Sequence, residues 1–181
     1  GRAGDYSDME HAQDQDALYR EAAETFGPAM QRLARATEAN AERQRDLVQD
    51  MHVAIWRSFA QFDGRCSLRT WVYRVTHNVA ASHVAREARR NRGTVTLDTI
   101  DQMPDGRSLS GEMEQADALG RLMTWIRRLK SPDHQIMTLY LEDLSAAEIA
   151  DITGLTPGAI ATRISRLKAY LTKDFQETDN A

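Results

Sequence analysis

The sequence is poor in several features that mark other classes of protein. It has one cysteine, Cys66, which excludes an internal disulfide, so we expect a reducing, cytoplasmic location. No apolar run approaches the length of a membrane-spanning helix, and no signal-peptide pattern is present. The 181 residues therefore suit one or two small globular domains with modest cores, rather than a membrane or secreted protein.

Residue patterns for catalysis are also missing. No glycine-rich phosphate loop follows a strand pattern, and the five histidines are scattered. His77 and His83 lie six residues apart, which is the wrong spacing for two ligands of one metal on a helix. We therefore expect no enzyme, no metal and no cofactor. Cys66 beside Arg65 has two interpretations, a redox-sensitive thiol or an inert cysteine, and the inert one is favoured.

Charge is unevenly distributed along the chain, although the formal net charge is only −4. Acidic residues outnumber basic ones by 12 to 7 in residues 1–64 and by 6 to 1 in residues 93–117. Residues 65–92 hold 7 basic residues and 1 acidic residue, and a second basic cluster lies in the region 163–173. The acidic total argues against a chain that coats nucleic acid everywhere, but two basic segments indicate two separate nucleic-acid contacts.

The region 145–173 has the pattern of two helices joined by a tight turn. Ser145 and Glu148 have the spacing of a capping box at the start of the first helix. Gly154 suits a left-handed helix exit, and Thr156 suits the cap of the next helix. These end signals predict a helix-turn-helix, while an ordinary helical hairpin is the alternative.

The second helix of this pair is predicted to be amphipathic. Pro157 suits its first position. Its buried face is predicted at i, i+4, i+7 and i+11, which are Ile160, Ile164, Leu167 and Leu171. The opposite face is small, polar and basic, so it has the character of a helix that enters a major groove.

The N-terminal part is predicted to contain a tail and two helices. Residues 1–15 are acidic and lack periodicity. A helical pattern starts at Asp16, is interrupted at Gly27-Pro28 and continues to Asn40. The next helix, 41–59, places Val53 outside its apolar stripe among charged residues, which suggests a partner surface or, alternatively, an unimportant surface valine.

Residues 61–66 are predicted to form a loop, and Ser67 is predicted to cap a third helix. The polar face of that helix mixes arginines with an aromatic residue and a histidine, and it ends in the basic run 86–92. Arginines can follow phosphates while aromatic or loop pockets hold unstacked bases, so this segment suits single-stranded DNA. Trp71 lies beside the apolar stripe, which favours the core over a stacking platform.

We predict an all-α fold of two small helical domains joined by a flexible linker, the C-terminal domain being the helix-turn-helix. The predicted divisions are a flexible acidic tail at 1–15, a first domain at 16–92, a linker at 93–114, a second domain at 115–176 and a tail at 177–181. The linker is predicted from its glycine, proline, serine and aspartate residues, which are typical of a flexible connection between domains.

Three segments resemble those of the extracytoplasmic-function sigma factors, the group-4 members of the sigma-70 family of bacterial RNA polymerase. Residues 46–57, DLVQDMHVAIWR, resemble the family's DLVQ-x-x-F-x-x-x-W helix. Residues 62–78, which contain SLRTWVYRV, resemble its F-x-x-W-L-Y-R-I segment, and residues 144–168 resemble its helix-turn-helix. The resemblance covers about residues 16–175, with the segments in the family's order.

The resemblance implies a sigma factor that binds core RNA polymerase at the β′ clamp helices and β flap, recognises −10 and −35 promoter DNA, and starts transcription of a stress regulon. It also implies an anti-sigma factor as partner. The implied polymerase contacts are Gln49, Asp50, Val53 and Arg57. The implied −10 contacts are Phe62, Asp63, Gly64, Arg65, Ser67, Arg69, Tyr73, Arg74, His77 and Asn78. The implied −35 contacts are Gly158, Ala159, Thr162, Arg163 and Arg166.

Some positions depart from the family's pattern, and other functions remain open. His77 stands where the family often has arginine, and Ala161 where it commonly has lysine, so no particular promoter sequence is transferred. One alternative is a stand-alone helix-turn-helix regulator that works without polymerase, although such a protein has no use for the helix 46–57. Another is a sigma-like protein that titrates a partner, and the basic segments argue against it.

Overall fold

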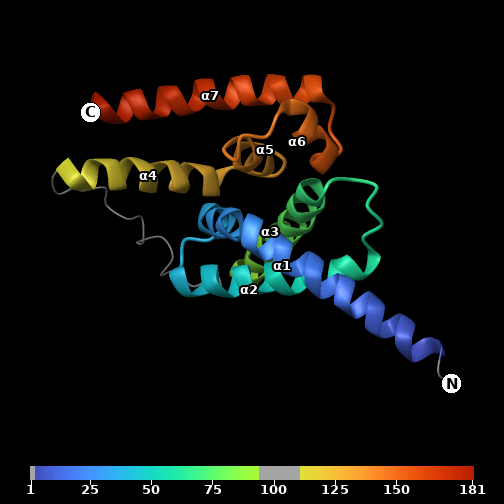
Figure 1. Cartoon of the computed structure of the whole chain (residues 1–181). Coiled ribbons are helices and arrows are strands. Elements are labelled where there is room, and N and C mark those ends of the chain that lie inside the picture. The colour runs from blue at the N-terminus through green and yellow to red at the C-terminus, as the bar shows by residue number, and fades with distance from the viewer. Residues whose placement is uncertain (1–2, 94–110) are drawn as a thin grey trace.

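The computed structural model describes residues 3–93 and 111–181, and all its regular elements there are helices (Figure 1). Side chains are described for residues 11, 12, 14–92 and 117–181. The N-terminal helices are α1 (Ala3–Thr37), α2 (Ala41–Ser58), the short 3-10 helix η1 (Phe59–Gln61) and α3 (Leu68–Gly93). The C-terminal helices are α4 (Gly111–Arg128), α5 (Asp133–Tyr140), α6 (Ala146–Thr153) and α7 (Pro157–Asp179). The predicted all-α fold with two helical regions is confirmed.

Three boundaries differ from the predicted ones. α1 begins at Ala3, so most of the predicted tail 1–15 is helical. α4 begins at Gly111 and α7 continues to Asp179, so both helices extend past the predicted limits of the second domain. Of the predicted linker 93–114, residues 94–110 lie outside the described residues, Gly93 ends α3, and 111–114 belong to α4.

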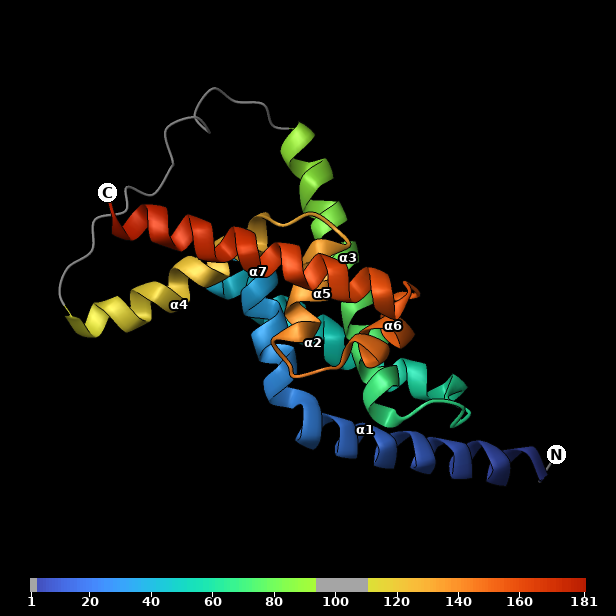
Figure 2. The same cartoon turned by 90° about the horizontal axis from the view of Figure 1, so that it is seen from above.

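α1 passes through Pro28 without ending there, contrary to the predicted interruption. A proline inside a helix removes one backbone hydrogen bond and bends the helix, and Figure 2 shows α1 changing direction along its length. The N-terminal arm of α1 is tied to the end of α2. Gln15 donates a hydrogen bond to the Trp56 carbonyl at 2.7 Å, and the Trp56 indole donates to Asp16 at 2.8 Å. These contacts fasten α1 to α2 at the end of the acidic segment.

The first helical region packs α1, α2 and α3 around one apolar core. The fully buried side chains of this first cluster include Met30, Leu47, Met51, Ile55 and Val72. They come from stripes at helical spacing on each helix, which is how an amphipathic helix buries one face. Asn40 caps α2 by accepting a hydrogen bond from the Arg43 amide at 3.0 Å.

The second helical region places α4 and α7 side by side, joined by α5 and α6 (Figure 1). Trp125 of α4 donates a hydrogen bond to Asp174 of α7 at 3.1 Å, and the Arg121 guanidinium lies 4.5 Å from the Phe175 ring centroid. The second cluster, which lies under α5, α6 and α7, includes Ile136, Leu139, Leu144, Ile149, Ile152 and Ile160.

The two regions pack against each other. α1 contacts α4, and α3 contacts α6. Ala29 and Tyr73, from α1 and α3, belong to the second cluster, and Ala36 of α1 joins a third cluster with Ile126, Met137 and Leu167. The helical regions therefore share apolar cores across the chain.

Candidate nucleic-acid interface

The turn between α6 and α7 is built by the predicted end signals. The Ser145 amide donates to Glu148 at 2.8 Å, and the Glu148 amide donates to the Ser145 hydroxyl at 3.2 Å, which completes the capping box. Gly154 ends α6 in the left-handed conformation, with φ 78°. Thr156 then caps α7 by accepting from the Ala159 amide at 3.2 Å. The local geometry predicted for the helix-turn-helix is present.

The outer face of α7 presents four of the five residues predicted to contact −35 DNA. Gly158, Ala159, Thr162 and Arg166 are exposed. Arg163 is half-buried instead, because its guanidinium pairs with Asp133 at the start of α5 at 2.7 Å. Arg163 therefore ties α7 to α5, and only Arg166 offers an exposed cation among the predicted contacts.

The outer face of α2 is open to solvent. The residues predicted to meet polymerase, which we call the α2 face, are all exposed: Gln49, Asp50, Val53 and Arg57. Val53 is 48% exposed, and the neighbouring Trp56 is 41% exposed. Asp50 also lies 3.8 Å from Arg86 of α3. Charged groups around an exposed valine and tryptophan are typical of a protein-binding surface.

Some of the DNA contacts predicted in the loop before α3 are packed in the core, and others are exposed to solvent. Phe62 packs edge-on against Phe59 and Trp71, with ring centroids 5.9 and 5.1 Å away. Trp71 also donates a hydrogen bond to Ser58 at 2.9 Å, which supports its predicted place in the core. The aromatic residues of this loop are therefore held by the core.

The remaining loop residues form a tight turn on the surface. Gly64 has φ 75°, which favours glycine, and Asp63 accepts a hydrogen bond from the Arg65 amide at 3.0 Å. The Arg65 side chain is 89% exposed. Ser67 caps the start of α3 by accepting from the Thr70 amide at 3.1 Å. The Arg65 guanidinium also pairs with the Asp63 carboxylate at 3.0 Å, so it is an exposed loop cation that already has a carboxylate beside it.

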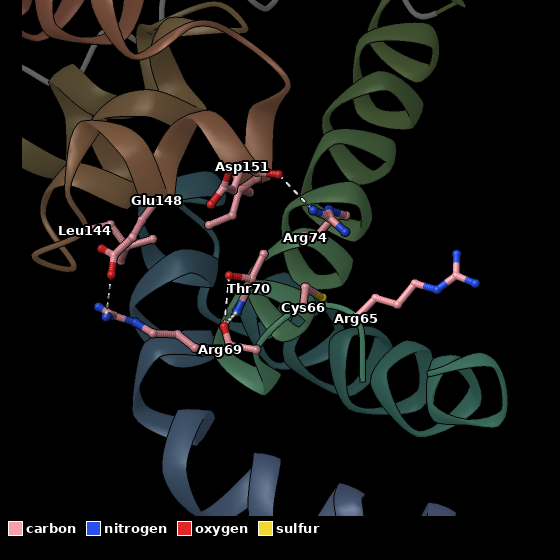
Figure 3. A pocket seen from close by; sticks show the side chains of 10 residues that line it. Arg65, Cys66, Arg69, Thr70, Arg74, Leu144, Glu148 and Asp151 are labelled. Carbon is pink, nitrogen blue, oxygen red and sulfur yellow. Dashed lines mark hydrogen bonds and ion pairs between the residues drawn. The ribbon is translucent and has the colours of Figure 1, made fainter. Parts of the chain in front are cut away.

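The polar face of α3 lies against the second helical region, which buries two of its residues and leaves two partly exposed. We call this set, Arg69, Tyr73, Arg74 and His77, the α3 face. Arg69 pairs with Glu148 of α6 at 3.4 Å, and Arg74 donates to the Asp151 carbonyl of α6 at 2.8 Å. Figure 3 shows both arginines pointing towards α6, whereas Arg65 points away. Tyr73 and His77 are 6% exposed, and only Asn78, the next predicted contact along α3, is exposed.

The α5–α6 loop contributes a carboxylate that the sequence did not single out. Glu142 accepts two hydrogen bonds from Arg32 of α1, at 2.6 and 2.7 Å, and one from the Tyr73 hydroxyl at 3.4 Å. Its carbonyl also accepts from Arg69 at 3.4 Å. Arg32 and Glu142 are 110 residues apart in the chain, so no local pattern marks the pair.

Apolar burial contributes more to this packing than the ion pair does. The Arg32 side chain is 59% exposed, so its pair with Glu142 is worth about 1 kcal/mol or less. Burying one large apolar side chain contributes about 1.5–3 kcal/mol, and Tyr73 inserts its ring among the second cluster. The apolar contacts therefore provide most of the free energy of this packing, and the ion pair adds a smaller amount.

Burial also changes the acid–base chemistry of this contact. Burial lowers the pKa of His77 from 6.5 to about 3, with His134 nearby adding to the effect. Burial lowers the pKa of His134 too, although its ring hydrogen-bonds to the Ala36 carbonyl at 2.9 Å. Burial and the neighbouring Glu142 charge raise the pKa of Tyr73. The contact between the regions therefore favours neutral His77 and His134 and a protonated Tyr73.

Two cavities lie between the helical regions. One of about 500 Å³ is polar and is lined by Cys66, Arg69 and Arg74 on one side and Glu148 and Asp151 on the other (Figure 3). A second, of about 200 Å³, is lined mainly by apolar groups of α1, α4 and α5.

The part of the chain that the structure describes contains no group of three histidine, cysteine or carboxylate side chains able to hold a metal ion. None of its helices is long and apolar enough to cross a membrane.

Comparison with known proteins accounts for both helical regions. The model of Sigma-70 region 2 matches residues 22–90, and the model of Sigma-70, region 4 matches residues 119–171. The first match contains the α2 and α3 faces, and the second contains the helix-turn-helix. Both describe parts of transcription initiation factors, which are not enzymes, so the prediction of a non-enzymatic chain is confirmed.

Named relatives match nearly the whole chain. The chain is 26% identical over 180 residues to RNA polymerase sigma factor YlaC of Bacillus subtilis, covering 94% of this chain and 96% of YlaC. It is 23% identical to ECF RNA polymerase sigma factor SigW of the same species, covering 91% of each. The structure of CnrH in complex with the cytosolic domain of CnrY shares the fold, with a TM-score of 0.67 and 20% identity over 93% of this chain and 94% of CnrH. These matches show that the chain belongs to the sigma-70 family, among its extracytoplasmic-function members.

Proposed function

We propose that this chain binds bacterial core RNA polymerase through the α2 face and directs it to promoters with −10 and −35 elements. Arg65, Arg69 and Arg74 would contact −10 DNA, and Arg166 would contact −35 DNA. The observation that carries the proposal is the pairing of two matched sigma regions with an open α2 face and an exposed α7 surface. Family membership further supports promoters of a stress regulon.

Physical chemistry supports the division of labour. The exposed N-terminal part of α7 combines small side chains with Arg166, which suits close approach to a major groove. Melting the −10 element needs a site for an extruded base, which costs a few kcal/mol and is offset by contacts to base and phosphate. The basic segment from Arg65 to Arg92 would supply the phosphate contacts.

An inhibitory partner is part of the same proposal. CnrH is bound by the cytosolic domain of CnrY, and the chain shares its fold over nearly its whole length. We propose that an anti-sigma factor regulates this chain in a comparable way. Exposed Val53 and Trp56 offer it apolar contact on the surface proposed for polymerase.

Run-off transcription with core polymerase and a library of bacterial promoter fragments tests the function. We expect transcripts that depend on the chain. Arg57→Ala should reduce them by weakening polymerase binding, and Arg166→Ala should cost about 1–3 kcal/mol of promoter affinity. Arg20→Ala, on an exposed position of α1 outside both basic segments, is the control and should leave transcription unchanged.

The outcome separates the two functions. If no transcript forms and core polymerase does not bind, while the chain still shifts duplex DNA, a stand-alone regulator is the better account.

A further inference from the structure

We propose that the apolar cavity between the helical regions is a binding site for a small aromatic acid. The cavity has a volume of about 200 Å³ and is lined by residues of α1, α3, α4 and α5 and of the loop that follows α5. Such a ligand would give the chain a chemical input besides DNA and protein partners. The inference does not depend on the proposed function, because the cavity is a feature of the chain whatever the chain binds.

The size and wall of the cavity suit one or two fused rings. An apolar protein cavity of about 150 Å³ can hold benzene, so the larger cavity here has room for a slightly larger ring system. Most of its wall is apolar, and the rings of Tyr73 and His77 and the thioether of Met123 contribute to it. Aromatic rings and methionine sulfur pack favourably against another aromatic ring. The wall therefore favours an aromatic body.

His77 provides a hydrogen-bonding group inside the cavity. Its side chain is only 6% exposed and lines the cavity. No residue that the structure describes forms a hydrogen bond with its ring. Burial lowers its pKa to about 3, so at pH 7 the neutral ring has one nitrogen that donates and one that accepts. Because buried polar groups are normally hydrogen-bonded, this ring points to a ligand that completes the pair.

The edge of the cavity carries a positive charge that lacks a counter-ion. Of its three charged residues, Arg32 and Glu142 pair with each other at 2.6 Å. The third, Arg35, is exposed, and its guanidinium pairs with no carboxylate of the described residues. Burial lowers the pKa of Arg127, and the nearby charge of Arg35 lowers it further, although Glu38 opposes this. Two neighbouring cations favour an anionic group on the ligand.

The cavity is open to solvent at two leucines. Leu119 of α4 and Leu141, which follows α5, line it and are each 47% exposed. A small molecule can therefore enter while the chain stays folded. Its ring would lie among the apolar residues, its carboxylate would face Arg35, and a ring N–H would pair with His77. Because the wall comes from both helical regions, a bound molecule would stabilise the folded chain by mass action.

Three small molecules separate these features. Indole-3-carboxylate has the ring, an N–H group and a negative charge. Indole-3-carboxamide is its neutral analogue, and 1-naphthoate keeps the charge and a similar size but lacks the N–H group. Isothermal titration calorimetry with the full chain at neutral pH measures their affinities. We expect indole-3-carboxylate to bind with a Kd of about 10–100 µM, and each of the other two to bind about fivefold to tenfold more weakly.

Variants of the lining residues assign each contact. Arg35→Gln should weaken indole-3-carboxylate about tenfold and leave the carboxamide unchanged. Arg20→Gln, at another exposed position of α1, is the matched control and should change neither. His77→Phe keeps a ring in the wall but removes its nitrogens, so it should weaken indole-3-carboxylate about fivefold and leave 1-naphthoate unchanged. Ala29→Leu fills part of the cavity and should abolish binding of all three molecules.

Three results would overturn the proposal. One is the lack of saturable binding of all three molecules at concentrations up to about 1 mM. Another is binding that Arg35→Gln and a folded Ala29→Leu both leave unchanged, since the molecules then bind elsewhere. The third is equal affinity for the carboxylate and the carboxamide, which contradicts an acid as the ligand.

Circular dichroism checks that each variant is folded. Arg35 is exposed, so its replacement tests the site even where Ala29→Leu does not fold. No polymerase or promoter enters this experiment, so its failure and the failure of the proposed function are separate results.

Discussion

At the scale of the residue, burial decides which predicted contacts are available. Arg65 and Arg166 project into solvent, whereas Tyr73 and His77 sit inside a contact between helical regions. Phe62 and Trp71 are held by the first cluster and by each other. The same residue types thus have different roles according to what covers them.

His77 makes the packed chain sensitive to acid. Its pKa is lowered to about 3 by burial, so the packed state resists the proton that an uncovered imidazole takes up below pH 6.5. The free energy of unfolding is therefore highest above pH 6.5, where His77 is neutral in both states. It decreases as the pH falls from 6.5 towards 3, because the unfolded chain then binds a proton that the folded chain does not. We expect the free energy of unfolding to fall by about 2 kcal/mol between pH 7.5 and pH 5 from this group.

Urea titrations at the two pH values measure the effect. His77→Gln should reduce the difference, whereas the exposed His11→Gln should keep it. The groups around His77, namely Tyr73, His134, Arg32, Arg35 and Glu142, are unchanged in both variants. An equal pH dependence in wild type and His77→Gln would contradict the assignment.

At the scale of the element, local chemistry sets the helix ends. The caps of α6 and α7, their turn and the first position of α7 all follow the sequence pattern. α1 is the exception, because its N-terminal arm is helical in spite of its acidic, aperiodic sequence. Gln15 and Asp16 contact Trp56 of α2 and so attach the end of this arm to the first helical region.

Two glycines that lead to opposite expectations test this reading of the turn. Gly154 has φ 78°, a conformation that strains any residue with a side chain, so Gly154→Ala should destabilise the chain by about 1 kcal/mol. A Cβ there meets no atom within 4 Å, so this strain is the whole expected effect. Gly120 lies inside α4, where a Cβ also meets no atom, so Gly120→Ala should stabilise by about 0.5–1 kcal/mol. Thermal unfolding followed by circular dichroism compares them. Equal shifts for both variants would mean that the turn does not need its left-handed residue.

At the scale of the whole molecule, the two regions share their cores. Ala29 of α1 is 8% exposed and belongs to the second cluster, so the regions should unfold together. We expect urea unfolding of wild type to give coincident transitions by circular dichroism and by fluorescence of Trp56, Trp71 and Trp125. Ala29→Asp places a charge in this contact and should separate the transitions.

Ala17→Asp on the exposed side of α1 is the control for that experiment and should keep a single transition. If Ala29→Asp also unfolds in one step, the shared cluster does not couple the regions.

The sequence by itself determined most of the helices, the helix-turn-helix and the family, and α1 is the element that it did not determine. Apolar stripes at helical spacing mark which side of α2, α3 and α7 is buried within its own region, and caps such as Ser145 act over three residues. Such signals are local, so they can be read without knowing the rest of the fold.

Only the tertiary structure decided what covers the polar faces. An arginine-rich face of α3 suits solvent, DNA or a carboxylate equally well by pattern, and periodicity does not choose among them. The choice was made by Glu142 and α6, which reach α1 and α3 from some 70 to 110 residues away. Contacts at that separation depend on how complementary surfaces meet in space, and the polar face of a single helix carries no record of its partner.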